Sequence, residues 1–534
     1  MRVLVVGSGA SGVHFALTAL ERGFRVTMID VGHERPEAPL PEASVEQLKE
    51  RLEDPVAYFV GERGQGVAYP ATKASFYGHP PSKDHVFRKP PGFVTQEIRM
   101  APVYSFARGG LAEAWTAGSY ELGPDDLREF PIDRAALAAG YRTVARRIGV
   151  GAAHDDLARF IPTDAEYLEP LPLDEHSALL LARYARRREG LQRGLRFHLG
   201  RSRVATLSRP HAGRPACAEL GRCFWGCPID AIYSPRVTLQ ECLRHPGFDY
   251  RPGRVATHFE YDDEGRVIAL ATVPVEGGEA ERLDADRYVL AAGALASSKL
   301  VLDTIHRRTG RVERLTGLMD NRQVHVPFLT PAMIGRQVEL ASYQFHHLAF
   351  ALERPDPAEY IHGQITTLRA ASTHPVIASL PLDGATGLRV FRRLRGSLAL
   401  ANVNLHDTRR EGSWLSIRPS DQGRSALLVQ YTDDPAEAEL IGDALARTRR
   451  AVRRLGGFVP PGMTRVLPKG FSVHYAGTLP FSRERRRFGA DPNGRSWDFP
   501  NLFFADGATF PFLPAKNLTF TLMANATRIA EALA

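Results

Sequence analysis

Three glycines near the N-terminus have a spacing that can hold a phosphate-bearing ligand. Gly7, Gly9 and Gly12 form the pattern G-x-G-x-x-G, and Asp30 lies 18 residues after Gly12. In such a pattern the first glycine permits a tight turn, the second lets the backbone approach a pyrophosphate, and the third allows close packing of a helix on a strand. An acidic side chain about 20 residues further on can accept hydrogen bonds from a ribose. The spacing therefore predicts a dinucleotide site, and by itself it does not distinguish NAD from FAD.

Two polar residues near the C-terminus can carry acid–base chemistry. His474 stands in the stretch VHYAGT, and Asn517 stands between the turn PFLPAK and an apolar tail with helical periodicity. A histidine with its ordinary pKa near 6.5 suits general-base catalysis, and an amide can hydrogen-bond an oxygen on which negative charge develops. The alternatives are a structural histidine at 474 and a helix cap at Asn517. The residue types alone leave both interpretations open.

All four cysteines lie close together in the sequence. Cys217, Cys223, Cys227 and Cys242 fall within 26 residues, and the first three have the spacing C-x5-C-x3-C. This is not a zinc-finger spacing, and no pair of histidines follows it. A cytosolic chain also argues against disulfides. One interpretation is a loop of buried free thiols, which pack as small hydrophobic side chains.

Apolar periodicity indicates the elements that must position these residues. Residues 3–6 are an apolar strand, VHFALTALERG is helical, and FRVTMID is a second strand that ends at Asp30. This context strengthens the glycine pattern, because the N-terminus of the helix offers free N–H groups and a positive dipole to phosphates. Further along, alternating runs broken by DDEG and EGGE predict a β-meander that leads into VLAAG.

Length and composition indicate an ordinary globular protein. The chain has 534 residues, 44% hydrophobic and 24% charged, so two domains or one large composite domain are expected. The net charge is only +8, and the Arg-rich stretch from Arg183 to Arg203 is better explained as a solvated helix face than as a patch for an anionic partner. No nucleic-acid-binding motif accompanies this stretch. No apolar run is long enough to span a membrane, and Met1 leads directly into a strand rather than a secretory signal, so a cytoplasmic location is expected.

Four further stretches carry a family resemblance. They are RGGLAEAWTAG from Arg108, EFPIDRAALAAGYRTVARRIGV from Glu129, VLAAGALASSKLVL from Val289, and the C-terminal segment FADGATFPFLPAKNLTF from Phe504. Together with the glycine pattern, they make the chain resemble the glucose–methanol–choline (GMC) family of FAD oxidoreductases, and within it the bacterial members that oxidise sugars and polyols. The resemblance touches both ends of the chain. Residues 306–465 carry no motif of the family.

The resemblance implies an α/β fold of the GMC, or p-hydroxybenzoate-hydroxylase-like, type. A composite, Rossmann-like FAD-binding domain with a β-meander would be joined by an α+β substrate domain with an antiparallel sheet. The FAD-binding domain would comprise residues 1–45, an FAD-contacting double-glycine motif at 105–125, residues 200–305 with the cysteines and the meander, and residues 470–534. Residues 46–104 would form a lid or connecting segment, and residues 126–199 (helical) and 306–469 the substrate domain. We expect the substrate-domain sheet to contain the strand-like runs RGSLALANVNLHD, SWLSIRPSD and SALLVQYTDD.

The resemblance also implies how the cofactor is held. The positions that correspond to FAD contacts are Gly7, Gly9, Ser11, Gly12, Asp30, Gly109, Gly110, Trp115, Ala292, Gly293, Asp506, Gly507 and Asn517. Some members attach FAD covalently through a histidine just before the Trp of the double-glycine motif. Here Ala114 precedes Trp115, so non-covalent FAD is expected.

The cysteine run resembles that of flavoprotein subunits of bacterial sugar dehydrogenases. In those proteins thiolates hold an iron–sulfur cluster, of the 3Fe–4S type, that takes electrons from FAD. On this resemblance Cys217, Cys223 and Cys227 are candidate cluster ligands. Other members of the family keep a similar loop with no assigned cluster, so a 3Fe–4S centre and buried free thiols both remain open.

The stretch VHYAGT matches the H-x-x-G-T pattern of the family, which places the catalytic histidine at His474 and its His-or-Asn partner at Asn517. The implied reaction oxidises a CH–OH group of a sugar, amino sugar or other alcohol to a carbonyl, by hydride transfer to flavin N5 with His474 as general base. The electron acceptor would be O2 or a redox partner. The alternatives are a flavin and iron–sulfur subunit that passes electrons to a protein, a lyase or isomerase, and a binding-only protein with structural FAD.

Overall fold

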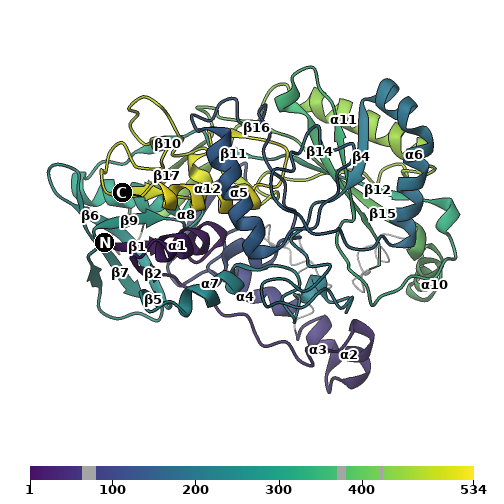
Figure 1. Ribbon diagram of the computed structural model, residues 1–534, viewed down its shortest axis with the longest axis horizontal. Helices are drawn as coiled ribbons and strands as arrows, with labels where there is room; N and C mark the ends of the chain where they lie inside the picture. The colour runs from purple at the N-terminus through teal and green to yellow at the C-terminus, as the bar shows by residue number, and fades with distance from the viewer. Residues whose placement is uncertain (63–79, 370–380, 421–424, 534) are drawn as a thin grey trace.

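The computed structural model describes residues 1–62, 80–369, 381–420 and 425–533. Two large sheets organise the molecule. A parallel sheet lies near the two chain ends, and an antiparallel sheet lies at the opposite end (Figure 1). The predicted FAD-binding residues Gly7, Gly9 and Asp30 lie in loops at the ends of strands of the parallel sheet, and Gly12 lies in the helix that follows the first strand.

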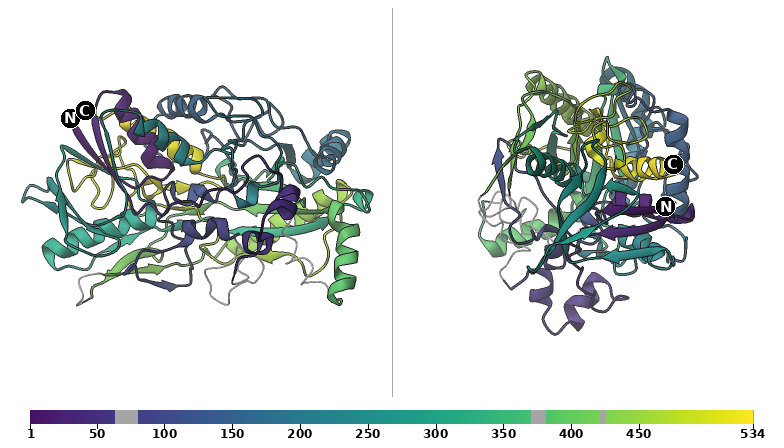
Figure 2. Two further views of the ribbon diagram at one scale, coloured as in Figure 1. Left: turned by 90° about the horizontal axis from the view of Figure 1, so that it is seen from below. Right: turned by 90° about the vertical axis from the view of Figure 1, so that its left-hand side faces the viewer.

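The parallel sheet is assembled from distant parts of the chain. Its five strands have the order β21–β9–β1–β2–β5, and every neighbouring pair is parallel. The bounds are β1 Arg2–Val6, β2 Arg25–Ile29, β5 Phe248–Arg251, β9 Arg287–Leu290 and β21 Leu502–Phe504. The first strand, RVLVV, is buried after Arg2, as expected for an inner strand of a parallel sheet. Since β1 and β21 belong to the same sheet, the two chain ends lie near one another (Figures 1 and 2).

Helices pack closely around this sheet. α1 connects β1 to β2 and packs against α7 and α12, and α12 packs in turn against α5. The bounds are α1 Ala10–Glu21, α5 Arg134–Ile148, α7 Pro235–Leu243 and α12 Thr519–Glu531. The predicted strand–turn–helix–strand unit and the predicted final helix are confirmed.

The β-meander is confirmed as a three-stranded antiparallel sheet. It consists of β6 Arg254–Tyr261, β7 Val267–Pro274 and β8 Glu281–Leu283. The predicted strand, small-residue turn and helix that follow it are β9 and α8 (Ala294–Thr309). α8 contacts both β6 of the meander and β17.

The antiparallel sheet has six strands in the order β19–β12–β15–β14–β13–β4. Their bounds are β4 Phe197–Arg201, β12 Gln323–Leu329, β13 Leu348–Leu352, β14 Ile361–Thr367, β15 Leu398–Asn404 and β19 Arg465–Val466. Alternate residues of these strands form an apolar core with α6 (Glu175–Leu195) and α11 (Glu437–Arg454). The opposite face, which the two-residue period of a strand separates from this core, carries polar side chains such as Gln364 and Asn402 beside apolar ones such as Ala349 and Leu400.

Two of the three strand-like runs expected in this sheet belong to another one. RGSLALANVNLHD supplies β15, whereas SWLSIRPSD and SALLVQYTDD supply β17 (Trp414–Arg418) and β18 (Ala426–Gln430). These two strands form a four-stranded sheet of order β10–β17–β18–β3, with β10 at Arg314–Thr316 and β3 at Thr95–Ile98. The alternating apolar residues of β17 and β18 pack in a different core from the one we expected. They are buried in the core that contains β1 and α8, and they are Leu415, Ile417, Leu427 and Val429.

The remaining elements are short. Two small strand pairs, β11 with β20 and β16 with β22, link the C-terminal segment to the middle of the chain. The bounds are α2 Val45–Arg51, α3 Pro55–Phe59, α4 Asp84–Phe87, α10 Gly384–Leu394, β11 Met319–Asp320, β16 Asp407–Thr408, β20 Tyr475–Ala476 and β22 Phe512–Leu513. Within the described ranges, no helix combines the length and the apolarity needed to cross a bilayer.

Candidate active site

The glycine turn between β1 and α1 has the geometry that the sequence pattern predicts. Gly7 has a φ of +101°, and a Cβ atom on it would lie 2.7 Å from the carbonyl oxygen of Ala291. A Cβ atom on Gly12 would lie 1.9 Å from the oxygen of Gly7, so α1 packs directly against the turn. A Cβ atom on Gly9 would have no protein atom within 4 Å. Gly9 therefore leaves room for a ligand above the N-terminus of α1, where free N–H groups favour phosphates.

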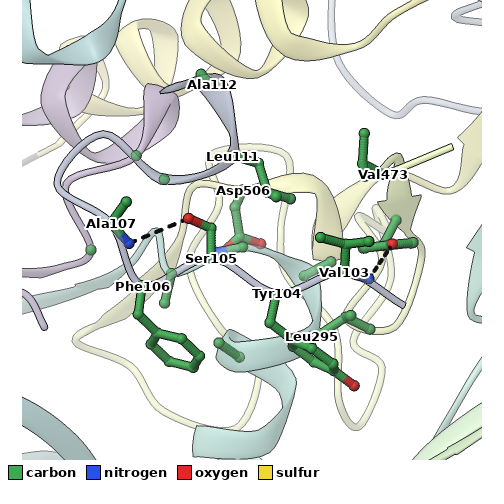
Figure 3. A pocket seen from close by; sticks show the side chains of 18 of the residues that line it. Val103, Tyr104, Ser105, Phe106, Ala107, Leu111, Ala112, Leu295, Val473 and Asp506 are labelled. Carbon is green, nitrogen blue, oxygen red and sulfur yellow. Dashed lines mark hydrogen bonds between the residues drawn. The ribbon is translucent and has the colours of Figure 1, made fainter. Parts of the chain in front are cut away.

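A cavity of about 1000 Å³ extends from this turn to the antiparallel sheet. The predicted site residues that line it are Gly7, Gly9, Ser11, Asp30, Gly110, Trp115, Ala292, Gly293, His474, Asp506, Gly507 and Asn517. Gly12 and Gly109 lie behind its wall, where the Gly109 N–H donates to Ser8 Oγ at 3.1 Å. Figure 3 shows the stretch from Val103 to Ala112 along the cavity, beside Leu295 and Asp506. Residues 103–107 were not predicted individually as cavity residues, although 105–107 fall within the predicted FAD-contacting segment 105–125.

Two buried carboxylates border the cofactor end of the cavity. Asp30, at the end of β2, accepts hydrogen bonds from Ser8 Oγ and, at 3.4 Å, from the hydroxyl of Tyr250. Asp506 accepts from the Gly293 N–H at 3.0 Å and from Ser297 Oγ, so it joins the C-terminal segment to the start of α8. Burial raises the pKa of each carboxyl to about 6, and these hydrogen bonds oppose the rise.

His474 is held as a neutral base at the cavity wall. Its Nδ1 lies 3.1 Å from the side-chain oxygen of Asn321. The amide nitrogen of Asn321 donates to the carbonyl oxygens of Leu405 and Pro514 at 2.8 and 3.1 Å, which fixes the orientation of this amide. His474 Nδ1 must therefore carry the hydrogen, and Nε2 carries the lone pair. Burial lowers the pKa of His474 to about 4, so the ring is uncharged at neutral pH.

The backbone immediately before His474 is strained. Val473 has a φ of +57°, a conformation that a β-branched residue rarely adopts. Such strain costs about 1–3 kcal/mol and persists only where the surrounding structure imposes it. Val473 lines the cavity with His474 (Figure 3). Strain at this point is consistent with a turn that is built to present His474.

Asn517 contacts the antiparallel sheet instead of capping the final helix. Its Oδ1 accepts a hydrogen bond from Gln364 Nε2 at 2.8 Å, and Gln364 Nε2 also donates to the hydroxyl of Tyr120 at 3.1 Å. The N-cap of α12 is Leu518, which makes no side-chain capping bond. The helix-cap alternative for Asn517 is therefore wrong. Because Oδ1 is occupied, Nδ2 is the group that Asn517 can offer to a ligand in the cavity.

Comparison with known proteins points to one family. Residues 413–526 match the family model GMC_oxred_C, described as GMC oxidoreductase. This C-terminal part of the chain therefore matches the GMC oxidoreductases, and the chain as a whole is similar to the proteins described below. GMC oxidoreductases bind FAD, and the turn at Gly7–Gly12 and the open space above Gly9 fit such a group.

Three curated proteins are similar to this chain. It is 26% identical to 6'''-hydroxyparomomycin C oxidase of Streptomyces lividus over 61% of the chain and 59% of that protein, and so matches less than two thirds of that relative's length. It is 24% identical to paromamine 6'-oxidase of Streptomyces fradiae over 100% of the chain and 91% of that protein. It is 22% identical to 2-methyl-1,2-propanediol dehydrogenase of Mycolicibacterium austroafricanum over 99% of the chain and 94% of that protein.

Solved structures share its fold. The crystal structure of pyridoxine 4-oxidase from Mesorbium loti superposes with a TM-score of 0.61 at 17% identity, covering 99% of this chain and 98% of that one. Formate oxidase superposes with a TM-score of 0.62 at 12% identity, covering 99% and 97%. The expected GMC fold is thus confirmed.

Among the described residues, the cysteines are not grouped as ligands of a metal ion. In the part of the chain that the structure describes, no group of three or more His, Cys, Asp or Glu side chains is placed to hold a metal ion. Cys217, Cys223 and Cys227 are free, and Cys223 Sγ accepts a hydrogen bond from the Gln344 N–H at 3.4 Å. Burial raises the pKa of Cys217 to about 11 and also raises that of Cys223, so both remain thiols. The 3Fe–4S hypothesis is therefore not supported.

A hydrogen-bond network anchors the loop that carries His474. The His474 N–H donates to Ser472 Oγ at 3.0 Å, and Ser472 Oγ donates to Asp320. Asp320 also accepts from the Gly470 N–H at 2.8 Å. Asn321, which orients the imidazole, follows Asp320 directly in the chain. The same short segment thus holds both the loop and the ring of His474.

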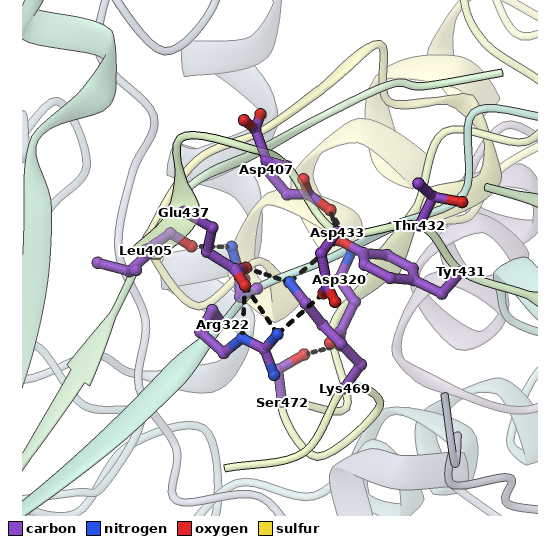
Figure 4. Close-up of polar contacts among 12 residues, drawn as sticks. Asp320, Arg322, Leu405, Asp407, Tyr431, Thr432, Asp433, Glu437, Lys469 and Ser472 are labelled. Carbon is purple, nitrogen blue, oxygen red and sulfur yellow. Dashed lines mark hydrogen bonds and ion pairs between the residues drawn. The ribbon is translucent and has the colours of Figure 1, made fainter. Parts of the chain in front are cut away.

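Charged side chains surround this segment (Figure 4). Lys469 donates to Glu437 and, at 3.1 Å, to the hydroxyl of Tyr431. Tyr431 donates to Asp407 at 2.6 Å, and Asp407 accepts from the Asp320 N–H at 2.8 Å. Burial raises the pKa of Asp320 to about 6, against the opposing charge of Lys469. None of these residues lies in the stretches that carry the family resemblance, so no sequence signal pointed to them.

Proposed function

We propose that this chain is a GMC oxidoreductase that uses non-covalently held FAD to oxidise a CH–OH group of an alcohol or sugar to a carbonyl, with His474 as the general base. The observation that carries the proposal is the neutral tautomer of His474. Its Nδ1–H is bound to Asn321, so Nε2 bears a lone pair in a residue that lines the cavity. Asn517 lines the same cavity and has its amide hydrogens available.

Named residues of the chain would hold the cofactor. The turn at Gly7–Gly12 and the N-terminus of α1 would bind the pyrophosphate, and Asp30 would bind the adenosine ribose. Ala114 offers no group for a covalent attachment, which favours non-covalent binding. When bound, FAD supplies the acceptor for the hydride that leaves the substrate carbon.

The side chains of the chain would handle the proton and the developing charge. His474 Nε2 takes the hydroxyl proton, a contribution that is typically about 10²–10⁴-fold in rate. Because burial lowers the pKa of His474 to about 4, it needs no prior deprotonation at neutral pH. Asn517 Nδ2 donates a hydrogen bond to the same substrate oxygen as negative charge grows on it.

The names of the relatives support a CH–OH substrate. Paromamine 6'-oxidase and 2-methyl-1,2-propanediol dehydrogenase are both named for the oxidation of molecules that carry hydroxyl groups. These two proteins align with 100% and 99% of the chain, so the likeness includes the region that lines the substrate end of the cavity.

The test is anaerobic reduction of the flavin by alcohols. The purified holoenzyme is mixed with 2-methyl-1,2-propanediol, D-glucose and paromamine, and bleaching of the flavin absorbance is followed. We expect His474→Ala to slow bleaching by about 10²–10⁴-fold while the FAD content stays unchanged.

His154→Ala is the matched control, because His154 is exposed and does not line the cavity. It should bleach at the parent rate. Equal rates for His474→Ala and the parent would refute the assignment of the base. Bleaching by an alcohol would also exclude a lyase or isomerase, in which substrate leaves the flavin oxidised.

A further inference from the structure

The wall of the cavity opposite the glycine turn includes the polar face of the six-stranded sheet. His325 on β12, Asn402 on β15 and Gln364 on β14 are partners across neighbouring strands, and all three line the cavity. Strand neighbours such as Val324 and Val403 point to the other face, into the core with α6 and α11. Directly opposed side chains on neighbouring strands have Cβ atoms about 4.5–5.5 Å apart. We call these three side chains the sheet row.

The sheet row is connected to the catalytic residues and has free hydrogen-bond acceptors. Gln364 Nε2 donates to Asn517 Oδ1 and to Tyr120, which leaves Gln364 Oε1 as an acceptor. Asn402 Oδ1 is buried and has no hydrogen-bond partner among the described residues. A buried, unpaired polar atom is costly unless a ligand or water satisfies it. Burial lowers the pKa of His325 to about 4, so this ring is neutral.

Carboxylates line the cavity only away from the sheet row, as far as the described residues show. They are Asp30, Asp303 and Asp506. Asp303 is paired with Lys299 at 2.6 Å, whereas Asp30 and Asp506 belong to the cofactor end. Among the segments outside the described ranges, 63–79 and 370–380 contain no Asp or Glu in the sequence, whereas 421–424 contains Asp421. No carboxylate among the described residues is therefore placed to balance the charge of a substrate ammonium group at the sheet row.

We propose that the sheet row recognises an uncharged substrate with several hydroxyl groups, such as a neutral sugar or polyol, and rejects amino sugars. Substrate hydroxyls donate to Asn402 Oδ1 and Gln364 Oε1 while another hydroxyl lies between His474 and Asn517. A buried ammonium without a partner loses its hydration and gains no opposite charge. The proposal rests on the proposed function, and it separates this chain from relatives that are named for paromamine and paromomycin derivatives.

The test compares D-glucose, D-glucosamine and 1,2-propanediol on the holoenzyme at pH 6, where the amino sugar is protonated. Dissociation constants come from the perturbation of the flavin absorbance, and rates come from anaerobic bleaching. We expect D-glucosamine to bind on the order of 100-fold more weakly than D-glucose. Equal or tighter binding of D-glucosamine, or no perturbation by D-glucose, would overturn the proposal.

Three variants test whether the sheet row causes the difference in binding between D-glucose and D-glucosamine. Asn402→Leu should weaken D-glucose binding roughly tenfold and affect 1,2-propanediol much less than D-glucose, because the small diol has fewer hydroxyl groups to place at the row. Asn402→Asp should shift the preference at least about tenfold toward D-glucosamine, because it supplies a counter-charge. Thr366→Val, a change on the neighbouring row of the same cavity wall, is the matched control and should shift neither preference.

The outcomes separate this inference from the proposed function. If 1,2-propanediol bleaches the flavin but Asn402→Leu and Asn402→Asp leave the sugar preference unchanged, the sheet row is not the recognition site and the proposed function stands. If Thr366→Val shifts the preference as much as the Asn402 variants do, the effect is not specific to the row and the proposal is wrong. If no alcohol bleaches the flavin, the proposed function itself fails.

Discussion

The two ends of the cavity are built on different physical principles. At the cofactor end the chain is constrained by backbone geometry: Gly7 adopts a positive φ, and Gly12 packs on the turn with no room for a Cβ atom. At the substrate end the sheet has ordinary backbone geometry, and its chemistry comes from which side chains line the cavity. A backbone constraint allows few residue types and therefore produces a recognisable sequence pattern. The face of a sheet accepts many different side chains, so it produces no such pattern.

The largest effect should come from the backbone constraint at the cofactor end. Gly12→Ala places a Cβ atom 1.9 Å from the Gly7 oxygen, so the turn or α1 must move. We expect this variant to lose FAD and to unfold at a lower urea concentration even as apoprotein. Urea unfolding and the flavin content of the purified protein measure both effects.

Gly9→Ala is the matched comparison for Gly12→Ala. Its Cβ atom meets no protein atom within 4 Å, so the apoprotein should unfold at the same urea concentration as the parent. FAD retention should still fall, because the added methyl group occupies the space for the pyrophosphate. If both variants behave alike, Gly9 and Gly12 do not have the separate roles that their geometry indicates.

An intermediate effect should come from the residue that orients His474. Asn321→Leu removes the acceptor for Nδ1–H, so we expect the rate of flavin reduction to fall about 10- to 100-fold, with a smaller change in substrate binding. Asn321→Asp keeps an acceptor but adds a negative charge, which favours the protonated ring and raises the pKa of His474.

The pH dependence of flavin reduction distinguishes orientation from a general structural role. In the parent, the rate should decline as the pH falls through about 4, because the base becomes protonated there. In Asn321→Asp this decline should move to higher pH. Asn493→Asp adds the same charge at an exposed position and should leave the profile unchanged. An unshifted profile in Asn321→Asp would show that Asn321 does not act through the imidazole.

The smallest effect is expected at the cysteines. Since Cys217 and Cys227 are not part of a metal-binding group, replacing both with Ser should leave iron content, flavin content and the rate of flavin reduction unchanged. An iron assay and the visible spectrum of protein purified without oxygen measure this. Stoichiometric iron in the parent, lost in the double variant, would restore the iron–sulfur hypothesis.

Much of the cofactor end could be predicted because its constraints are local. The strand–turn–helix–strand unit, the meander and the final helix all follow from apolar periods and from the spacing of the glycines in the turn. The contact between Gly12 and Gly7 is local in the chain, whereas the close approach of Gly7 to Ala291 is not. Asp30 lies directly after β2, as the predicted strand FRVTMID implies, since one helix separates this strand from the glycine turn; its contact with a ribose stays a prediction. The strands β17 and β18 were recognised as strands, but alternation alone does not state which sheet a strand joins.

By itself the sequence determined the elements, the glycine turn, and the identity of His474 and Asn517 as candidates. Only the tertiary structure decided that Asn321 fixes the tautomer of His474, that Gln364 rather than the helix end holds Asn517, and that His325, Asn402 and Gln364 form one row. The physical reason is separation along the chain. Asn321 and His474 are 153 residues apart, as are Gln364 and Asn517, and such contacts depend on sheet pairing and core packing that no local pattern encodes.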